Sequence, residues 1–191
     1  RNDISYGLSA TDQWVYFTKP TPSERNGVGS FKDVLAKPKF TKKRGFFVNP
    51  FSLEITAKDS DTVIRYTTDY SEPTATNGKK YTNPLAVRRT TVVRAAAFKI
   101  GMLPSRVETH TYAYNLSKAV TSLPMMSLVT ENSNLWGNTG IMETSPRNTT
   151  KRGIAWERPV SMELIYPGTG KALQANAGLR VQGGNYIRGR Y

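Results

Sequence analysis

The chain has 191 residues, no cysteine and one histidine, and its formal net charge is +13. The missing cysteines exclude disulfides, iron–sulfur clusters, zinc–thiolate sites and thiol nucleophiles, and one histidine excludes a multi-histidine metal site, so we expect no metal site in this chain. No apolar run approaches the roughly 20 residues that a membrane-spanning helix needs. The abundance of Ser, Thr, Asn and Tyr favours strands and loops over helices.

The positive charge comes from 27 Lys and Arg against 14 Asp and Glu, and it is scattered in short clusters. Such a field attracts polyanions, including anionic cell-wall polymers, other anionic glycans and nucleic acid. The sequence contains no recognisable nucleic-acid-binding module, so a nucleic-acid partner is not expected. We interpret most of these charges as solvated surface, with an anionic cell-wall polymer or glycan as the alternative partner.

The first 44 residues predict little regular structure. Residues 14–18 (WVYFT) indicate a strand, which ends where Pro20 and Pro22 interrupt sheet pairing. Too little chain precedes this strand to build a core, so we expect residues 1–26 to be the end of a truncated domain. Residues 27–44 are rich in Gly and Lys without a sustained period, which predicts a linker.

Residues 45–115 predict a small antiparallel β-sandwich. Phe51, Leu53 and Ile55 alternate with polar residues, which is the period-two pattern of a half-buried strand. Further strands are indicated by TVIRYTTD, by YTNPLAVRRTTVVRAAAFK with a break near Arg88, and by RVETHTYAYN. Strands at this spacing, with turn residues between them, are typical of a sandwich.

Residues 116–191 predict the start of a second β-rich domain. After a connector over residues 116–123, LPMMSLVT indicates a strand, and residues 159–182 indicate a hairpin that turns at PGTGK. The second half of this hairpin, LQANAGLRVQGG, alternates apolar and polar residues. Because a hairpin with one more strand rarely stands alone, we expect this domain to be incomplete in the chain.

Three segments resemble known families. Residues 5–26, SYGLSATDQWVYFTKPTPSERN, resemble the end of a lamin-tail-like domain, with Leu8 where that family usually has arginine. Residues 46–114 resemble the chitobiase/β-hexosaminidase C-terminal module, which is fibronectin type III-like, through IRYTTDYSEPT, KYTNPLAV and TTVVRAAAFKIGMLPSRVETHTY. Residues 123–187 resemble the start of a spore-coat, CotH-type kinase domain through LPMMSLVTENSNLWGNTGIM, WERPVSMELI and LQANAGLRVQGG.

These resemblances imply a mainly β fold: an immunoglobulin/fibronectin III-like sandwich plus an incomplete, β-rich, kinase-like N-terminal segment. They also imply an accessory role, because the sandwich family brings no active site and the kinase family's catalytic acids lie further downstream. We therefore expect no catalytic residue and no cofactor in this chain, and ATP with a divalent metal only in a parent kinase.

The expected function is a non-catalytic accessory and spacer region of an exported, multidomain bacterial surface protein that carries a CotH-like kinase domain. Its partners would be neighbouring domains of the same polypeptide, and its location extracellular or at the cell surface. Two alternatives stay open. The chain could be the N-terminal part of an atypical kinase that contributes to nucleotide binding, or a carbohydrate-binding module.

Two glycine-containing stretches are candidates for phosphate contact. Gly183 and Gly184 end the last predicted strand and precede Arg188 and Arg190, so backbone amides and charge could both meet a phosphate. We keep these four residues as a candidate nucleotide-facing loop, with a plain turn or bulge as the alternative. The GTGK at residues 168–171 lacks the earlier Gly and the following Ser or Thr of a phosphate-binding loop, so it predicts a hairpin turn.

The single histidine and the aromatic residues offer weaker candidates. His110 has no nucleophile-elbow motif to act on, so we interpret it as a sheet-surface residue. Trp14, Tyr70, Trp136 and Trp156 could stack on sugar rings. Trp136 fills a large apolar position of the kinase-like pattern, which predicts packing, and Tyr70 is the residue that we expect to be exposed as a glycan contact.

Residues 66–74, YTTDYSEPT, place two carboxylates three residues apart. Asp69 can accept a hydrogen bond from the backbone two residues on, and Pro73 prevents continued sheet pairing. We therefore predict that Asp69 and Glu72 shape a loop, with calcium capture as the alternative. Related modules usually have glycine where Tyr70 stands. Because tyrosine rarely adopts positive φ, we predict a type I-like turn with the ring held out or laid over a neighbour.

Overall fold

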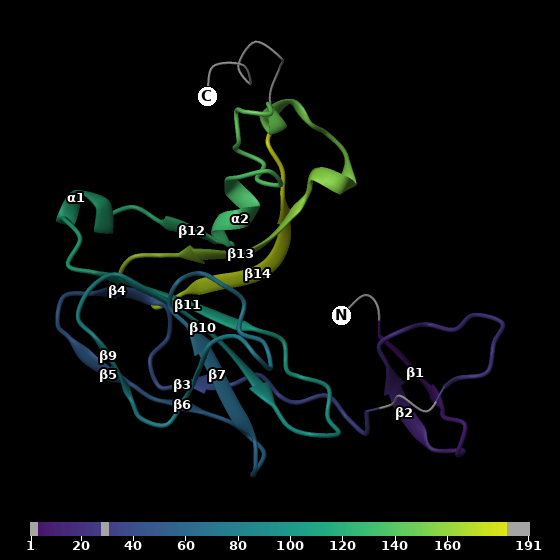
Figure 1. Cartoon of the computed structure of the whole chain (residues 1–191). Helices are drawn as coiled ribbons and strands as arrows, with labels where there is room; N and C mark the ends of the chain where they lie inside the picture. Colours follow the sequence, from purple (N-terminus) through teal and green to yellow (C-terminus); the bar gives the residue numbers. More distant parts are fainter. Residues whose placement is uncertain (1–3, 28–30, 183–191) are drawn as a thin grey trace.

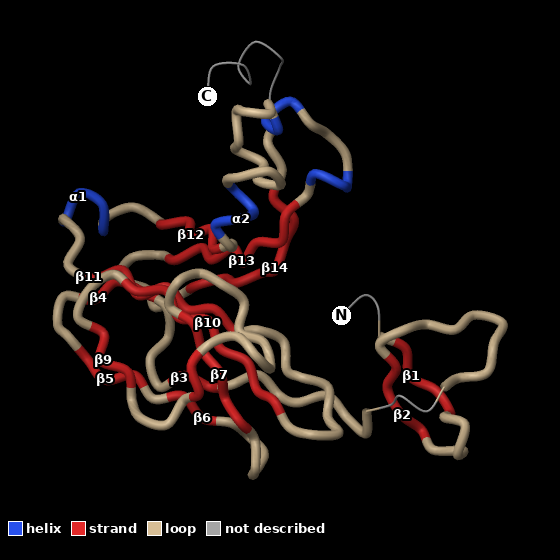
Figure 2. Tube along the Cα trace, viewed as in Figure 1, coloured by secondary structure: helices blue, strands red, loops and turns tan. Residues whose placement is uncertain are grey.

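The computed structural model describes residues 4–27 and 31–182, and its regular structure is almost entirely β (Figures 1 and 2). The strands are β1 (Ser5–Leu8), β2 (Trp14–Phe17), β3 (Lys39–Phe40), β4 (Gly45–Phe47), β5 (Phe51–Leu53), β6 (Ile55–Thr56), β7 (Val63–Thr67), β8 (Lys79–Lys80), β9 (Leu85–Val87), β10 (Thr91–Phe98), β11 (Glu108–Tyr114), β12 (Met125–Val129), β13 (Arg158–Ile165) and β14 (Ala172–Leu179). Four short helical segments accompany them: α1 (Lys118–Thr121), α2 (Asn132–Leu135), η1 (Asn148–Thr150) and η2 (Ile154–Trp156). None of the helices in the described ranges is long and apolar enough to cross a membrane.

Strands β3 to β11 form a sandwich. A five-stranded sheet in the order β4-β11-β10-β7-β8 packs against the short pairs β5-β9 and β3-β6. The shared core is a cluster of buried side chains from both layers: Leu53, Ile55, Ile64, Val87, Val93, Ala95 and Tyr112. The predicted fold class, mainly β with a fibronectin-like sandwich, is therefore confirmed.

The period-two pattern places the core residues as expected. Leu53 and Ile55 are 0% and 2% exposed, whereas the intervening Glu54 is exposed. Side chains alternate across a strand, so every second residue enters the core. The strand break near Arg88 is also confirmed, because β9 ends at Val87 and β10 begins at Thr91.

One strand pairing differs from the predicted antiparallel arrangement. Strand β4 pairs with β11 in parallel, with Gly45 opposite Tyr112 and Phe47 opposite Tyr114. Parallel neighbours need a long crossover, and here all of the strands from β5 to β10 lie between the two in sequence. A local alternation pattern carries no information on such a distant pairing.

The segment expected to be a linker packs along the sandwich. Leu35 is 4% exposed, and its N–H donates to the carbonyl oxygen of Leu103 at 3.0 Å. The N–H of Leu103 donates in turn to the carbonyl oxygen of Asp33 at 2.9 Å. Further on, β3 pairs with β6. Single apolar residues such as Leu35 dock without any period, which is why composition alone indicated only a linker.

The chain ends on either side of the sandwich form a hairpin and a sheet. Strands β1 and β2 make a hairpin that lies beside the sandwich (Figure 1). Strands β12, β13 and β14 make an antiparallel C-terminal sheet, which confirms the predicted hairpin. Its turn places Gly168 and Gly170 at φ values of 69° and 63°, a region that glycine adopts without steric cost. The predicted hairpin turn at GTGK is thus confirmed.

The C-terminal sheet has one buried face and one exposed face. Ser161, Glu163 and Ile165 alternate along β13 and are at most 2% exposed, because this face lies on the sandwich. On the opposite face Met126 and Leu173 are more than half exposed. Figure 1 shows the sheet lying over β11, so the junction between the two parts forms where β13 faces β11.

Candidate functional site

A fully buried carboxylate joins the C-terminal sheet to the sandwich. Glu163 on β13 is 0% exposed, and it accepts hydrogen bonds from the hydroxyl of Thr111 and, at 3.3 Å, from the backbone N–H of Thr111. The Thr111 hydroxyl also lies 2.8 Å from that of Ser127 on β12. Arg44 forms an ion pair with Glu163, with Nε 2.5 Å from Oε1 but without hydrogen-bond alignment. The Glu163 side chain therefore connects β13 to β11 through Thr111 and to the segment before β4 through Arg44.

A second carboxylate extends this cluster toward the surface. Glu108 on β11 pairs with Arg44 at 3.0 Å and with Lys37 at 2.7 Å, and His110 Nε2 lies 3.3 Å from it. Partial burial opposes ionisation of Glu108, but the hydrogen bonds from His110 and Lys37 outweigh it and lower the pKa of Glu108 to about 2. Lys37 and Arg44 thus form a network with Glu108 that keeps its carboxylate ionised.

The interpretation of His110 as a surface residue is wrong. Its side chain is buried and stacks on Phe40, with ring centroids 4.4 Å apart and planes at 12°. Its Nδ1 lies 3.3 Å from the carbonyl oxygen of Lys42. The residues just before β4 cover this part of β11, which a strand pattern alone does not indicate. His110 therefore serves the junction network, together with the buried Tyr112, whose hydroxyl donates to the same carbonyl of Lys42 at 2.9 Å.

The loop-shaping role of Asp69 is confirmed. Its Oδ1 accepts hydrogen bonds from the hydroxyl of Ser71 at 2.6 Å and from the Ser71 backbone N–H at 3.2 Å, and these bonds lower the pKa of Asp69. Glu72 contributes its backbone, since its N–H donates to Glu131 Oε1 at 3.0 Å. Among the described residues no group of three or more Asp, Glu or His side chains converges to hold a metal ion.

The predicted conformation of Tyr70 is wrong. Its φ is +70°, the left-handed region that the steric argument excluded, although its ring is 52% exposed as expected. The physical reason is Arg94 on β10, whose Nη1 donates to the Tyr70 carbonyl oxygen at 2.7 Å. The Thr67 hydroxyl also stabilises the turn, because it donates a hydrogen bond to the Ser71 carbonyl oxygen at 2.6 Å. Two hydrogen bonds thus hold the turn in a conformation that the side chain disfavours.

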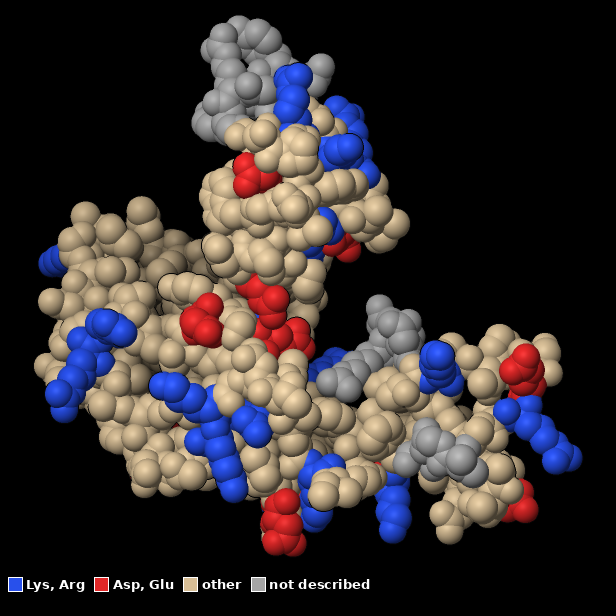
Figure 3. Space-filling model, in the orientation of Figure 1, with Lys and Arg blue, Asp and Glu red and all other residues tan. Residues whose placement is uncertain are grey.

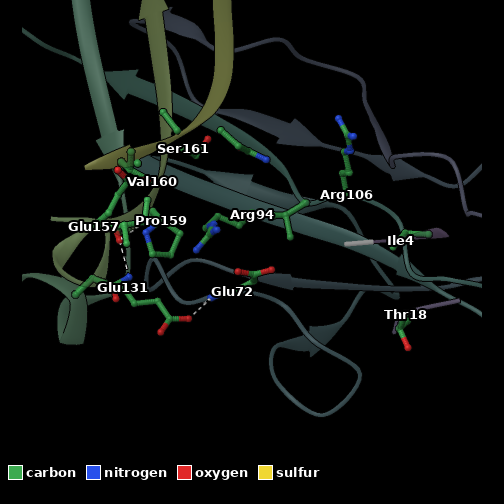
Figure 4. A pocket seen from close by; sticks show the side chains of 17 residues that line it. Ile4, Thr18, Glu72, Arg94, Arg106, Glu131, Glu157, Pro159, Val160 and Ser161 are labelled. Carbon is green, nitrogen blue, oxygen red and sulfur yellow. Dashed lines mark hydrogen bonds between the residues drawn. The ribbon is translucent and has the colours of Figure 1, made fainter. Parts of the chain in front are cut away.

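A groove of about 1020 Å³ runs along the junction (Figure 4). Arg94 lies in its wall and is 9% exposed, with Glu72 and Glu131 beside it. Burial lowers the pKa of Arg94, and the two carboxylates oppose that shift. Figure 3 shows acidic side chains gathered where the sandwich meets the C-terminal part, while most Lys and Arg on this face lie elsewhere. The groove therefore combines one buried cation with a locally acidic rim.

The other candidate residues that the structure describes do not gather in one place. Gly183, Gly184, Arg188 and Arg190 lie outside the described residues, so the nucleotide-facing loop stays a prediction. The predicted packing of Trp136 is wrong, since its side chain is 51% exposed. At this position the Trp136 backbone, rather than its side chain, is closely packed. It lies so near Gly140 that a Cβ added to Gly140 would be 2.2 Å from the Trp136 N atom.

The remaining tryptophans have partners of their own. Trp156 lies beneath the cationic groups of Lys151 and Arg158, 5.8 and 5.2 Å from its ring centre. Trp14 is 60% exposed and stacks on Tyr6 at 5.3 Å. It does not line the groove, although Ile4 and Thr18, which flank the β1–β2 hairpin, do.

Sequence reasoning missed Glu163, Arg44 and Arg94. A signal existed for Glu163, because it alternates with Ser161 and Ile165 along a predicted strand, but both faces of that strand are mixed in polarity. Arg44 and Arg94 gave no local signal, because one lies in an apparent linker and the other follows a run of strand-forming residues.

A family model described as "Fn3 associated" matches residues 53–112, about a third of the chain. A comparison with curated proteins found no match. The matched segment runs from β5 into β11 and so covers most of the sandwich. It identifies this part as similar to fibronectin III-associated modules, which are accessory β-modules and are not themselves catalytic.

We predict that acid weakens the junction through Glu108. Its folded pKa of about 2 lies below the ordinary 4.5, so its ionised form stabilises the fold above pH 4.5 and loses this effect as the pH falls toward 2. The contribution is on the order of 1–2 kcal/mol, because Glu108 is partly screened by solvent. Urea unfolding at pH 7 should show Glu108→Gln less stable than wild type, with the difference shrinking toward pH 2. Glu54→Gln, at an exposed position, is the control, and an equal difference at both pH values would contradict the prediction.

We also predict that Tyr70→Gly stabilises the protein by about 0.5–1 kcal/mol, because glycine adopts positive φ without steric cost. The matched variant Tyr70→Ala removes the ring but keeps the strained backbone, so its stability should not rise. Unfolding free energies from urea titrations compare the two. A glycine variant less stable than the alanine variant would show that the turn is not strained at this residue.

Proposed function

We propose that this chain is a non-catalytic accessory and spacer region that fixes the orientation of the domain following it in an exported bacterial surface protein. The observation that carries the proposal is the buried contact of Glu163 with Thr111 and Arg44. A flexible spacer has no need for a fully buried carboxylate shared between two modules.

The energetics of that contact support a fixed orientation. Separating the C-terminal sheet from the sandwich would return Glu163 to water but leave Arg44 without one of its two carboxylates. A shift of the sheet that moved Glu163 away from its partners but kept it covered would leave an uncompensated buried charge, which typically costs about 3–5 kcal/mol. The exposed hydrogen bond from the Glu72 N–H to Glu131 Oε1 is a second contact between the sandwich and the C-terminal part.

The identity of the flanking domains rests on resemblance. The motifs at residues 123–187 are similar to the start of a CotH-type kinase, and those at residues 5–26 to the end of a lamin-tail-like domain. The sandwich motifs are similar to the chitobiase C-terminal module, a more specific assignment than the fibronectin III-associated match. In this proposal ATP and a divalent metal belong to the downstream kinase domain, and the sandwich presents that domain at the cell surface.

A specific observation favours carbohydrate binding as a second candidate. Tyr6 and Trp14 are 57% and 60% exposed on one face of the β1–β2 hairpin, and Tyr6 also contacts Tyr16 with ring centroids 4.7 Å apart. Exposed aromatic clusters of this kind mark interaction surfaces more often than isolated rings do. Tyr70, the glycan contact expected from the sequence, is exposed but lies on a different element.

For the principal proposal we predict that Glu163→Ala lowers the unfolding free energy by about 3–5 kcal/mol, because it removes one of the two carboxylates of Arg44 and the acceptor of Thr111 and leaves a cavity in their place. Protease cleavage in the connector at residues 116–123 should become faster at the same time, as the C-terminal sheet loosens. Glu54→Ala, at an exposed sandwich position, is the matched control and should change neither quantity. Wild-type stability and cleavage rate in Glu163→Ala would contradict a role in fixing the orientation.

For the second candidate, pull-down on chitin, cellulose and peptidoglycan is the test. Carbohydrate binding predicts retention on at least one polymer that is lost in Trp14→Ala, with Trp136→Ala as the control at another exposed tryptophan. Loss in Tyr70→Ala instead would place the contact on the sandwich loop. No retention of wild type on any of the three ends this candidate.

A further inference from the structure

The wall of the groove contains a buried arginine that forms no ion pair with any acidic residue among those the structure describes. Arg94 is 9% exposed, and its Nη1 is used by the Tyr70 carbonyl oxygen. Its Nε has no hydrogen-bond partner within the part of the chain that the structure describes. Neither Glu72 nor Glu131 forms an ion pair with it there, although both are near enough to act on it electrostatically. A buried guanidinium without a paired carboxylate is energetically costly unless a bound anionic group pairs with it.

The other residues of the lining restrict which class of ligand could pair with Arg94 in the groove. Glu72 and Glu131 lie beside Arg94, and Glu157 also lines the groove, so a multiply charged phosphate entering it would meet three carboxylates. The described lining contains no aromatic side chain on which a sugar ring could stack. It offers instead hydroxyl and amide groups and both signs of charge: Thr130, Asn134, Ser161 and Asn176, with Arg106 as a second cation.

Peptides match this combination. A peptide carries a carboxylate, either at its C-terminus or on an Asp or Glu side chain, and Arg pairs with carboxylates in a two-pronged geometry. Its backbone N–H groups and ammonium group are donors suited to the glutamates. The groove volume of about 1020 Å³ is at the upper end of the range of about 300–1,000 Å³ for ligand clefts, which leaves room for several residues.

We propose that the groove between the sandwich and the C-terminal sheet binds a peptide segment through a carboxylate held by Arg94, with Glu72 and Glu131 accepting the donors of the same peptide. Because Arg94 belongs to the sandwich and Glu131 follows the C-terminal strand β12, the bound peptide would contact both parts at their seam. This binding role goes beyond the spacer function and does not depend on it.

The direct test is NMR titration of the intact chain with the tripeptide Ala-Ala-Ala, observing the side-chain Nε–Hε signal of Arg94. The proposal predicts a saturable shift of this signal, with a dissociation constant in the millimolar range. The C-terminally amidated tripeptide should bind at least about tenfold more weakly, because it lacks the carboxylate. Arg94→Gln has no such signal, so its binding is followed through the backbone amides of Glu131 and Asn134, which also line the groove. It should lose binding by a similar factor, while Arg88→Gln, at an exposed site outside the groove, should not.

Two further ligands separate the alternatives. The doubly blocked peptide acetyl-Ala-Asp-Ala-amide has only a side-chain carboxylate, so its binding in place of Ala-Ala-Ala would assign the site to an internal acidic residue rather than to a chain end. Inorganic phosphate binding as tightly as either peptide would overturn the proposal. So would the absence of any shift with both peptides.

A second variant is needed because Arg94→Gln also removes the hydrogen bond to the Tyr70 carbonyl oxygen. Glu131→Gln keeps an acceptor for the Glu72 N–H, and it should weaken the binding of Ala-Ala-Ala more than the binding of N-acetylated Ala-Ala-Ala.

Discussion

The carboxylate of Glu163 decides how the two halves of this molecule are arranged. It is buried on a strand of the C-terminal sheet, and its partners, Thr111 and Arg44, belong to the sandwich. A carboxylate in such a place is stable only while both partners stay in position, since an unpaired buried charge is far more costly than an unpaired surface charge. The position of the sheet, and with it the groove along the seam, follows from this requirement.

The same seam explains the strained turn at Tyr70. Arg94 extends from β10 to the carbonyl oxygen of Tyr70, and the next residues reach Glu131 through the N–H of Glu72. The turn is thus held between the sandwich and the residues after β12. Strained backbone persists where surrounding contacts determine it, and such positions often border binding sites. The accessory β-module and the groove on its flank are therefore parts of one structural arrangement.

The predictable features of the fold are those with a local period or a local turn signal. Leu53 and Ile55 were placed in the core by alternation, and the β13–β14 hairpin by its Pro-Gly turn. The features that could not be predicted depend on contacts between distant segments. His110 is buried because residues before β4 cover it, and the conformation of Tyr70 depends on an arginine 24 residues away. Glu163 alternates correctly, but only the packing of the sheet on β11 shows that its face is the buried one.

The junction at Glu163 makes the sandwich and the C-terminal sheet one rigid body. The most direct test is ¹⁵N relaxation of the backbone amides in the intact chain, which gives a rotational correlation time for each part. A rigid junction predicts one common correlation time for residues 45–114 and residues 125–179. Two distinct times, with the shorter one for the C-terminal sheet, would show that the parts tumble independently and would contradict a rigid junction.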